Sequence, residues 1–439
     1  MNTEKHRQGT EAQRDEGAKC KAAPIPRVPI PSGSGVVAAI TVLLLMTGHA
    51  LAQPCGGYEV TAIIQTPVDC GFGFDITTGL GLNDDGAVVG FYWCSGWEHK
   101  EAFVWTAEEG FVTLERPQGV SSAIAEDIND AGIICGTAAV SGLGSRGFIY
   151  GYEGDQFTIL DIPPGGNTSV ARGINSAGGI VGFWGDIVNG PFPQAFIWRD
   201  GETIDIHPDF GTVKSRALDI NADGLVTGWM GDSQLNEARA FVWDNGKVTQ
   251  LPPLPDGITS EGWSLNCRLD VVGRGRFFDP RLDATVWRAF AFVNGEPFHI
   301  DALPGTSHSN ALDINNAQTV VGASNSRAFI WQDGLLTDLN DLIKPSFNGD
   351  VYLASGINQA GQIAGSATTD LGDLVAVLLT PIEGAAGDLN NDCQVGVKDL
   401  LMLLGNWGPC DNCENCPADL NADWVVGVAD LLILLGNWG

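Results

Sequence analysis

A repeat of about 46 residues is the feature that most restricts what this chain can fold into. The pattern small-x-x-(Ile/Leu)-Asn-x-x-Gly-x-(Ile/Val)-(Val/Ile)-Gly recurs along residues 75–366, with successive copies 43 to 49 residues apart. The repeat asparagines are Asn83, Asn129, Asn175, Asn221, Asn266, Asn315 and Asn358. Such a period is typical of proteins in which one supersecondary unit is repeated.

Each part of the repeat predicts a local structure. Asn-x-x-Gly predicts a type I turn, in which the Asn side chain bonds the backbone two residues on and Gly takes the left-handed position. The residue four positions before each Asn is Gly or Ala, as a crowded inner strand would require. A strand that is apolar on both faces follows about twenty residues after each Asn, so neighbouring sheets must cover it. Its copies are Ala102–Trp105, Gly147–Tyr150, Ala195–Trp198, Ala240–Trp243, Ala289–Phe292, Ala328–Trp331 and Ala376–Leu379.

Four strands per repeat predict an all-β chain, and seven repeats predict a seven-bladed β-propeller over residues 53–382. A strand over Tyr58–Ile64 precedes the first repeat, and the last repeat ends after Leu374–Thr380. We expect this N-terminal strand to complete the seventh blade and remove the open edges. An open β-solenoid is the alternative. The fifth repeat is degenerate, because Leu265–Leu269 lacks the turn Gly.

Aspartates occur irregularly two residues before the repeat Asn. They are Asp127, Asp219 and Asp313, and the other repeats carry Gly81, Gly173, Ser264 and Gly356. In a closed propeller these carboxylates would converge near the central channel, where they could bind a cation or act as an acid/base pair on a sugar. Turn-capping or solvated aspartates are the alternative.

The remaining residue types indicate little chemistry. Trp105, Trp198, Trp243 and Trp331 are expected to pack between blades, whereas Trp184 and Trp229 are better candidates for exposed aromatics. None of the histidines lies in a metal-ligand spacing, and neither a nucleophile elbow nor a phosphate-binding loop is present. We therefore assign no catalytic and no organic cofactor-binding residue, and catalysis stays an open question at this point.

The repeats resemble the bacterial extracellular HAF-repeat family over about residues 57–380. The block that carries the resemblance reads Glu-Ala-Phe, Gln-Ala-Phe, Arg-Ala-Phe or Arg-Gly-Phe here, so the family's histidine is absent in the repeats that align. The family implies an extracellular repeat protein without an established activity. The resemblance therefore implies a location rather than a reaction.

Residues 1–52 are predicted to be a secretory signal peptide. A basic region is followed by the apolar run Val36–Met46 and by the small-x-small ending at Ala52. The run is shorter than the ~20 residues that a membrane-spanning helix needs, so we expect no membrane span in the mature chain. The whole chain has a net charge of −30 from 23 basic and 53 acidic residues, which argues against nucleic acid as a partner.

Export predicts disulfides for the nine cysteines after residue 52. Because nine is odd, at least one thiol stays free or pairs between chains. They are Cys55, Cys70, Cys94, Cys135, Cys267, Cys393, Cys410, Cys413 and Cys416. Two local disulfides are favoured in the C-terminal group, and a four-thiolate zinc site is the alternative.

After a linker at 383–387, residues 388–439 contain two 12-residue segments with the ligand spacing of a calcium loop, each followed by an apolar helix. Side-chain oxygens at positions 1, 3, 5 and 12 and a carbonyl at position 7 would wrap one Ca²⁺ in each. The ligands are Asp388, Asn390, Asp392, Gln394 (carbonyl) and Asp399, then Asp419, Asn421, Asp423, Val425 (carbonyl) and Asp430. The helices should place Leu400, Leu403, Leu404 and Trp407, and Leu431, Leu434, Leu435 and Trp438, on one stripe each.

The duplicated loop-and-helix unit, with Asp at position 12, resembles a type I dockerin over about residues 387–439. That resemblance implies two bound Ca²⁺ and a cohesin-like or cell-surface scaffold protein as partner. Cys393 and Trp424 replace the usual Gly at position 6, and the usual hydroxyl pair before position 12 is missing, so the partner's identity does not carry over. We predict a non-catalytic binding or structural propeller for a glycan or protein ligand. A carbohydrate-active enzyme in polysaccharide catabolism is the alternative, because dockerin-like modules commonly accompany such enzymes.

Overall fold

A computed structural model describes residues 57–63, 75–94, 99–151, 156–163, 166–185, 193–207, 214–231, 238–382, 386–389, 395–409, 416–421 and 425–438. Over these ranges the chain is mostly β, with two α-helices near its C-terminal end. The predicted signal peptide at 1–52 and residues 383–385 of the predicted linker lie outside the described residues.

Five four-stranded antiparallel sheets follow the chain order in the described ranges. They are β6–β9 (Val120–Ile128, Ile133–Val140, Gly144–Gly151, Gln156–Ile159), β10–β13 (Thr168–Ile174, Ile180–Gly185, Gln194–Arg199, Glu202–Asp205), β14–β17 (Lys214–Ile220, Val226–Gly231, Arg239–Asp244, Lys247–Gln250), β18–β21 (Gly257–Leu265, Val271–Asp279, Ala284–Val293, Glu296–Ile300) and β22–β25 (Asn310–Ile314, Val320–Ser324, Arg327–Gln332, Leu335–Asp338). Each contains one copy of the sequence repeat.

The first and last repeats share one eight-stranded sheet. Its strands are β1 (Tyr58–Ile63), β2–β5 (Asp75–Leu82, Val88–Cys94, Glu101–Thr106, Gly110–Thr113) and β26–β28 (Gly349–Ile357, Ile363–Thr369, Leu374–Pro381). A single parallel pair, Ile76 with Leu374, joins the two halves. A short 3₁₀ helix, Leu339–Leu342, precedes β26.

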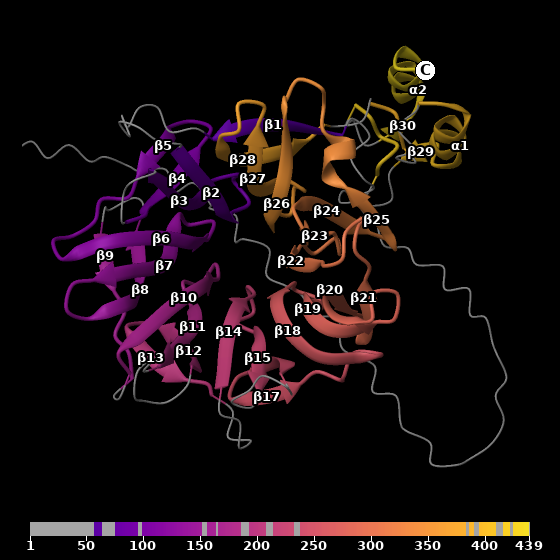
Figure 1. Ribbon diagram of the computed structural model, residues 1–439. Coiled ribbons are helices and arrows are strands. Elements are labelled where there is room, and N and C mark those ends of the chain that lie inside the picture. The colour runs from indigo at the N-terminus through magenta and orange to yellow at the C-terminus, as the bar shows by residue number, and fades with distance from the viewer. Residues whose placement is uncertain are drawn as a thin grey trace, which may run out of the picture.

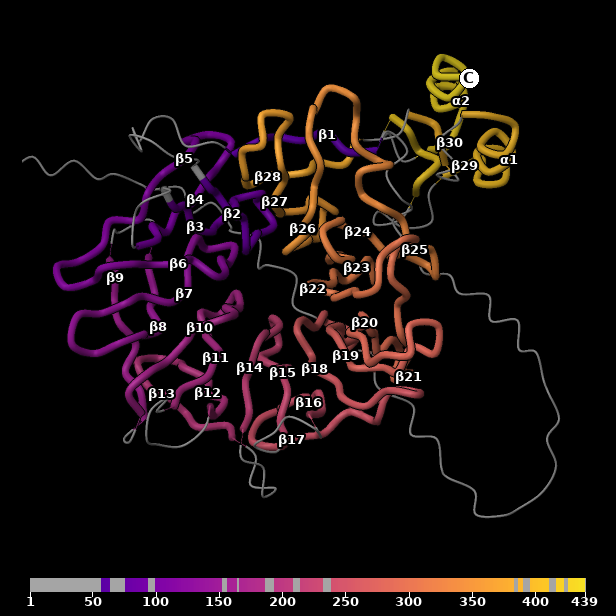
Figure 2. Tube along the Cα trace, in the orientation of Figure 1, coloured from indigo at the N-terminus to yellow at the C-terminus, as the bar shows by residue number. Residues whose placement is uncertain are grey.

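The sheets follow one another around a central opening, so the two ends of the repeat array meet (Figure 1). Figure 2 shows the indigo first repeat beside the orange last repeat. Strand β1 pairs antiparallel with β28, from Tyr58 opposite Pro381 to Ile63 opposite Ala376. This confirms the prediction that the N-terminal strand pairs with the last repeat, over Tyr58–Ile63.

The apolar third strand of each repeat lies in the core between neighbouring sheets. Its phenylalanines are at most 2% exposed: Phe103, Phe148, Phe196, Phe241, Phe290 and Phe329. The predicted packing tryptophans join the same clusters, with Trp243 7% exposed. The small residue before each turn is crowded as expected, because a Cβ on Gly79 would lie 2.8 Å from the Gly365 carbonyl oxygen.

The repeat asparagines form a closed circle of hydrogen bonds. Each Nδ2 donates to the backbone carbonyl of the next repeat's Asn at 2.9–3.2 Å, and Asn358 donates to Asn83. Each Asn oxygen also accepts from its own turn, as Asn129 Oδ1 does from the Ile133 N–H at 3.0 Å. The turn ends at a left-handed Gly in five repeats, but at Leu269 (φ 67°) and Gln318 (φ 63°) in the fifth and sixth.

The C-terminal helices α1 (Val397–Gly405) and α2 (Val428–Gly436) contact each other, and the strands β29 (Gly408–Pro409) and β30 (Val425–Val426) pair alongside. Leu403 and Leu434 are fully buried in a shared core. Four members of the two predicted apolar stripes are 44–48% exposed: Leu404, Trp407, Leu435 and Trp438. A single pair of nine-residue helices buries only the faces that contact each other, so apolar residues on the other faces stay exposed.

Cys135 in β7 is a free, fully buried thiol, which fits the odd cysteine count. Burial raises the pKa of this thiol well above its usual value. Most of the other predicted pairing partners, Cys55, Cys70, Cys393, Cys410 and Cys413, lie outside the described residues. In the described ranges the chain forms no helix long and apolar enough to span a membrane.

Candidate functional site

The innermost strand of every repeat contains a one-residue bulge at the same place. Pairing with the second strand shifts register between the residues four and two positions before the repeat Asn, so the residue three positions before it is left unpaired. The unpaired residues are Leu80, Glu126, Arg172, Leu218, Trp263, Leu312 and Ser355. A bulge re-aims a side chain, and here it does so seven times around one axis.

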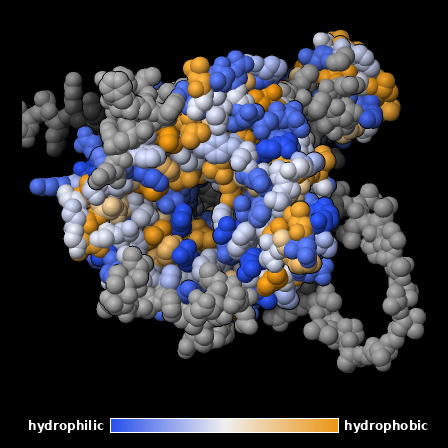
Figure 3. Space-filling model, viewed as in Figure 1, coloured by the Kyte–Doolittle hydropathy of each residue, from blue (hydrophilic) through white to orange (hydrophobic). Residues whose placement is uncertain are grey.

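All seven bulge residues line one cavity of about 410 Å³ at the centre of the ring. It is completed by Arg216, Trp229, Glu261, Arg274 and Leu353. We call it the central pocket. Figure 3 shows an opening at this place, with both hydrophobic and hydrophilic residues along its rim. Because the bulge residue is leucine in three repeats and Glu, Arg, Trp or Ser in the others, a symmetric scaffold forms an asymmetric pocket.

Two ion pairs cross between neighbouring strands of the central pocket. Arg172 Nη1 lies 2.8 Å from Glu126 Oε2, and Arg274 Nε lies 2.9 Å from Glu261 Oε2. Trp263 Nε1 also donates to Glu261, at 3.3 Å. Burial raises the pKa of Glu126, and the Arg172 charge opposes that rise. Both pocket carboxylates therefore already have cationic partners.

Arg216 is the exception among the pocket's charged side chains. Within the described residues its guanidinium makes no hydrogen bond or ion pair, and its buried Nε has no acceptor. It is held by aromatic rings instead, 4.3 Å from the centre of Phe183 and 5.4 Å from that of Trp229. Burial, followed by the nearby Arg172 charge, lowers the pKa of Arg216.

These pocket residues were missed by the sequence analysis, which considered the positions two and four before each Asn but not the one between them. The available signal was the chemical variety of the residue three positions before the Asn: Leu, Glu, Arg, Leu, Trp, Leu and Ser. The position before it holds only Gly or Ala, and the position after it only Asp, Gly or Ser. The expectation that Trp184 and Trp229 are exposed is wrong, because each is 5% exposed. Trp229 lies beneath Arg216, where its ring positions the guanidinium.

The three inner aspartates are links between neighbouring repeats. Each carboxylate accepts one N–H from the following residue and one from the next repeat, as Asp127 does from Ile128 at 2.8 Å and Ile174 at 2.9 Å. Asp219 reaches Leu265 and Asp313 reaches Ile357 in the same way. Repeats without an aspartate have a small residue at this position, where a neighbouring repeat leaves little room. A Cβ on Gly173, for example, would lie 3.1 Å from Asp219 Cα.

The aspartates repel one another electrostatically, since burial raises the pKa values of Asp127 and Asp313 and the Asp219 charge raises them further. In the described part of the chain no group of three metal-ligating side chains is found. Burial raises the pKa of all three, and for Asp313 the value reaches about 7, with repulsion from Asp219 as the next cause. Asp313 also accepts from the Ser264 hydroxyl at 2.6 Å. Inter-repeat bonding is therefore their visible role.

Asp313 predicts a pH dependence of stability. Its pKa rises from 3.8 to about 7 on folding, so the folded chain binds more protons than the unfolded chain between these values. The free energy of unfolding should fall as the pH rises from about 4 to 7, by up to ~4 kcal/mol from this group. Urea unfolding at the two ends of this range should show a smaller fall in Asp313→Asn than in wild type. Exposed Asp333→Asn is the control, and equal falls in all three chains would contradict the prediction.

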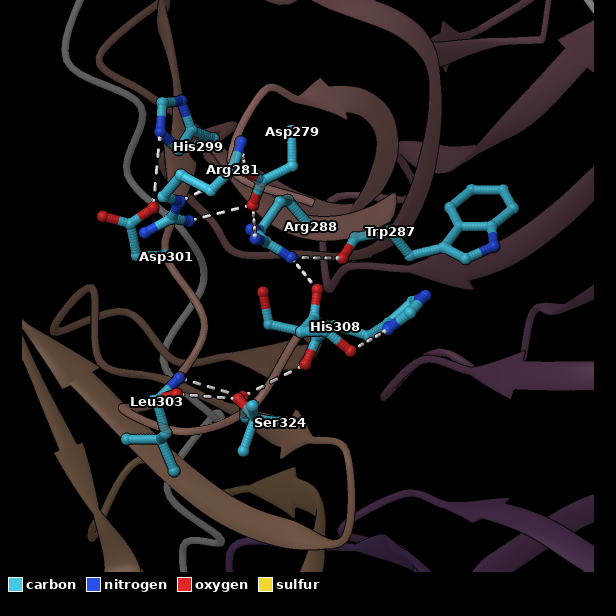
Figure 4. Close-up of polar contacts among 12 residues, drawn as sticks. Asp279, Arg281, Trp287, Arg288, His299, Asp301, Leu303, His308 and Ser324 are labelled. Atoms are coloured by element: carbon cyan, nitrogen blue, oxygen red, sulfur yellow. Dashed lines mark hydrogen bonds and ion pairs between the residues drawn. The ribbon is translucent and has the colours of Figure 1, made fainter. Parts of the chain in front are cut away.

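A second cavity, of about 390 Å³, lies beside the long β19–β20 hairpin. Figure 4 shows its charges meeting one another: Asp279 accepts from Arg281 and from the 5% exposed Arg288, each at 2.9 Å. Hydrogen bonds from Arg281 lower the pKa of Asp279 to about 2. Arg288 also donates to the Ser307 carbonyl of the next repeat. These charges are already paired, which indicates a structural network.

The predicted calcium loops are described only in part. Asn390, Asp392, Gln394 and Asp423 lie outside the described residues, while Asp388, Asp399, Asp419, Asn421, Val425 and Asp430 lie within them. Asp399 and Asp430, the last ligands of the two loops, are fully buried. Asp399 accepts from the Leu389 and Gly396 N–H groups, each at 2.8 Å, and Asp430 repeats this with Leu420 and Gly427 at 2.7 Å. The first and last positions of each loop are therefore close together.

No family model matches the chain, and no curated protein matches it. Among solved structures, an oligogalacturonate lyase from Vibrio parahaemolyticus aligns with 11% identity and a TM-score of 0.44, covering 73% of this chain and 93% of that one. The β-propeller domain of the Trilobed protease from Pyrococcus furiosus aligns with 10% identity and a TM-score of 0.43, covering 70% and 94%. The ring of antiparallel sheets described above is a β-propeller architecture.

Proposed function

We propose that the protein is a secreted or cell-surface binding or structural protein without catalytic activity. Its propeller would present the central pocket to a ligand, and its C-terminal unit would attach it to a partner. The observation that carries this is the repeated bulge, which turns seven side chains of five residue types into one pocket while both pocket carboxylates are engaged by arginine. A guanidinium partner favours the ionised form of a carboxyl group, which makes that group a weaker general base.

We also propose that the propeller has seven blades. Seven bulged inner strands, each followed by a member of the asparagine circle, support this count. The seventh blade would consist of β26, β27, β28 and β1. A strand from the N-terminal side then joins the two ends of the array, which leaves fewer unpaired edges than an open solenoid would.

For the C-terminal unit we propose a dockerin-like attachment that depends on two Ca²⁺. The residues fit that ion, since the donors are all oxygens and the buried carboxylates Asp399 and Asp430 lie beside the first residues of their loops. When bound, Ca²⁺ would supply charge neutralisation among these carboxylates. The exposed residues Leu404, Trp407, Leu435 and Trp438 form two equivalent apolar surfaces that suit a scaffold protein of the cohesin type.

A carbohydrate-active enzyme stays the second candidate, because Asp313 has a pKa of about 7 and lies within electrostatic range of Asp219. One experiment separates the two functions. Residues 53–439 are incubated in calcium buffer with plant and algal polysaccharides, and both depletion of the protein and new reducing ends are measured. Depletion without cleavage supports the binding function. New reducing ends that disappear in Asp313→Asn would overturn the non-catalytic proposal.

Calcium titration of the same chain tests the attachment unit. We expect about two Ca²⁺ per wild-type chain and about one in either Asp399→Asn or Asp430→Asn, because each variant removes a carboxylate from one loop. Exposed Asp333→Asn, outside the tail, should keep both. Calorimetry provides the stoichiometry, and a wild-type chain that binds no Ca²⁺, or single variants that still bind two, would contradict the proposal.

A further inference from the structure

The central pocket has a surplus of positive charge in a strongly acidic protein. Three guanidinium groups and two carboxylates line it, which leaves one positive charge, while the whole chain has a net charge of −30. The two carboxylates are each in an ion pair with Arg172 or Arg274. Among the described residues Arg216 is therefore the guanidinium of this pocket without an ion-pair partner, and its half-buried position makes an unpartnered charge costly.

Arg216 is preorganised rather than loose. Its guanidinium lies against Phe183 and Trp229, which fix the plane of the group, and among the described residues its hydrogen-bond donors have no protein acceptor. A planar guanidinium with free donors matches the two oxygens of a carboxylate. Glu126 and Glu261 flank the pocket, so a singly charged anion is favoured over a doubly charged one such as a phosphate monoester.

The opposite side of the central pocket is apolar. Repeats two to five contribute the charged residues, whereas the sixth, seventh and first contribute Leu312, Leu353 and Leu80, together with Ser355. These leucines are only half-buried although they lie in the middle of the molecule. Apolar surface in a concave site is typically covered by the body of a ligand.

From these contacts we propose that the central pocket binds a small organic monocarboxylate, with its carboxylate on Arg216 and an apolar body against Leu80, Leu312 and Leu353. The volume of about 410 Å³ is sufficient for a molecule of one ring and a short side chain. This inference rests on the proposed binding function, to which it adds the chemical class of the ligand and the residue that recognises its charge.

Calorimetry on residues 53–439 at pH 7 and low salt tests it with 3-phenylpropionate, its uncharged amide and D-glucuronate. We expect 3-phenylpropionate to bind at least about tenfold more tightly than the amide, because a hydrogen-bonded charge pair is lost in the amide. Arg216→Met keeps an apolar stem and should weaken 3-phenylpropionate about ten- to a hundredfold. Arg216→Lys keeps the charge without the planar fork and should be intermediate. Exposed Arg268→Met, outside the pocket, should bind like wild type.

Equal binding of the acid and the amide, or no binding of either, would overturn the proposal. Tighter binding of D-glucuronate than of 3-phenylpropionate would overturn the proposal that the ligand has an apolar body. A thermal melt of each variant separates loss of the ligand contact from loss of the fold, and Arg216→Lys covers the case in which Arg216→Met does not fold. Depletion by a polysaccharide that is unchanged in a folded Arg216→Met variant would leave the binding function standing and count against this pocket as its site.

Discussion

Asn129→Ala is expected to lower the free energy of unfolding by about 2–4 kcal/mol, because it removes three hydrogen bonds at about 0.5–1.5 kcal/mol each, and the one to the Asn175 carbonyl is buried. Asn129 Nδ2 donates to the Asn175 carbonyl at 2.9 Å, and Oδ1 accepts from Ala131 at 3.1 Å and from Ile133 at 3.0 Å. The side chain thus closes its own turn and also holds the next repeat. Urea unfolding followed by tryptophan fluorescence measures the loss.

Asn348→Ala is the matched control, since Asn348 is exposed and lies outside the asparagine circle. It should change the free energy of unfolding by less than about 0.5 kcal/mol. A loss of less than about 1 kcal/mol in Asn129→Ala would mean that water replaces the three bonds, and that the circle does not hold the repeats together.

Deletion of residues 57–63 is expected to abolish cooperative unfolding. The deletion removes Tyr58 and Ile63, which are 2% and 0% exposed, and leaves the edge of β28 unpaired from Ala376 to Pro381. Buried apolar side chains contribute about 1.5–3 kcal/mol each, and six residues of strand pairing are lost as well. A loss of at least about 5 kcal/mol is comparable with the total stability of a typical domain.

Calorimetric melting of the deletion variant and two point variants measures this effect. Ile63→Ala should lower the free energy of unfolding by about 2–4 kcal/mol through the cavity it leaves. Thr61→Ala, at an exposed position on the same strand, should leave the melt almost unchanged. A deletion variant that melts cooperatively at the wild-type temperature would show that pairing of β1 with β28 does not stabilise the ring.

Much of the fold could be predicted because the residues of each repeat specify its local structure. The Asn-x-x-Gly turn, the apolar third strand with its buried phenylalanines and the small residue at the crowded inner strand all recur in register. Pairing of the N-terminal strand with the last repeat followed from counting strands, since the last repeat lacks one. The sixth-repeat turn was harder, because Gln318 takes a left-handed conformation that the sequence pattern assigns to Gly.

The site was less predictable for a geometric reason. An alternating strand pattern places the residues four and two before the Asn on one face and the residue three before it on the other. The bulge breaks that alternation and turns Glu126, Arg172 and Trp263 towards the axis. Trp229 was also expected at the surface, whereas it lies opposite Arg216 in the pairing of β14 with β15 and contacts its guanidinium.

The amino-acid sequence by itself determined the repeat, the turns, the β class of the chain and the spacing of the oxygen ligands in the tail, because these depend on residues close together along the chain. Tertiary structure alone decided which side chains meet at the axis. Arg216 and Leu353 are separated by 137 positions (353 − 216) and face one pocket only because the ring brings the inner strands together. Burial and missing partners, which make Arg216 a binding candidate, are properties of that packing and of no single segment.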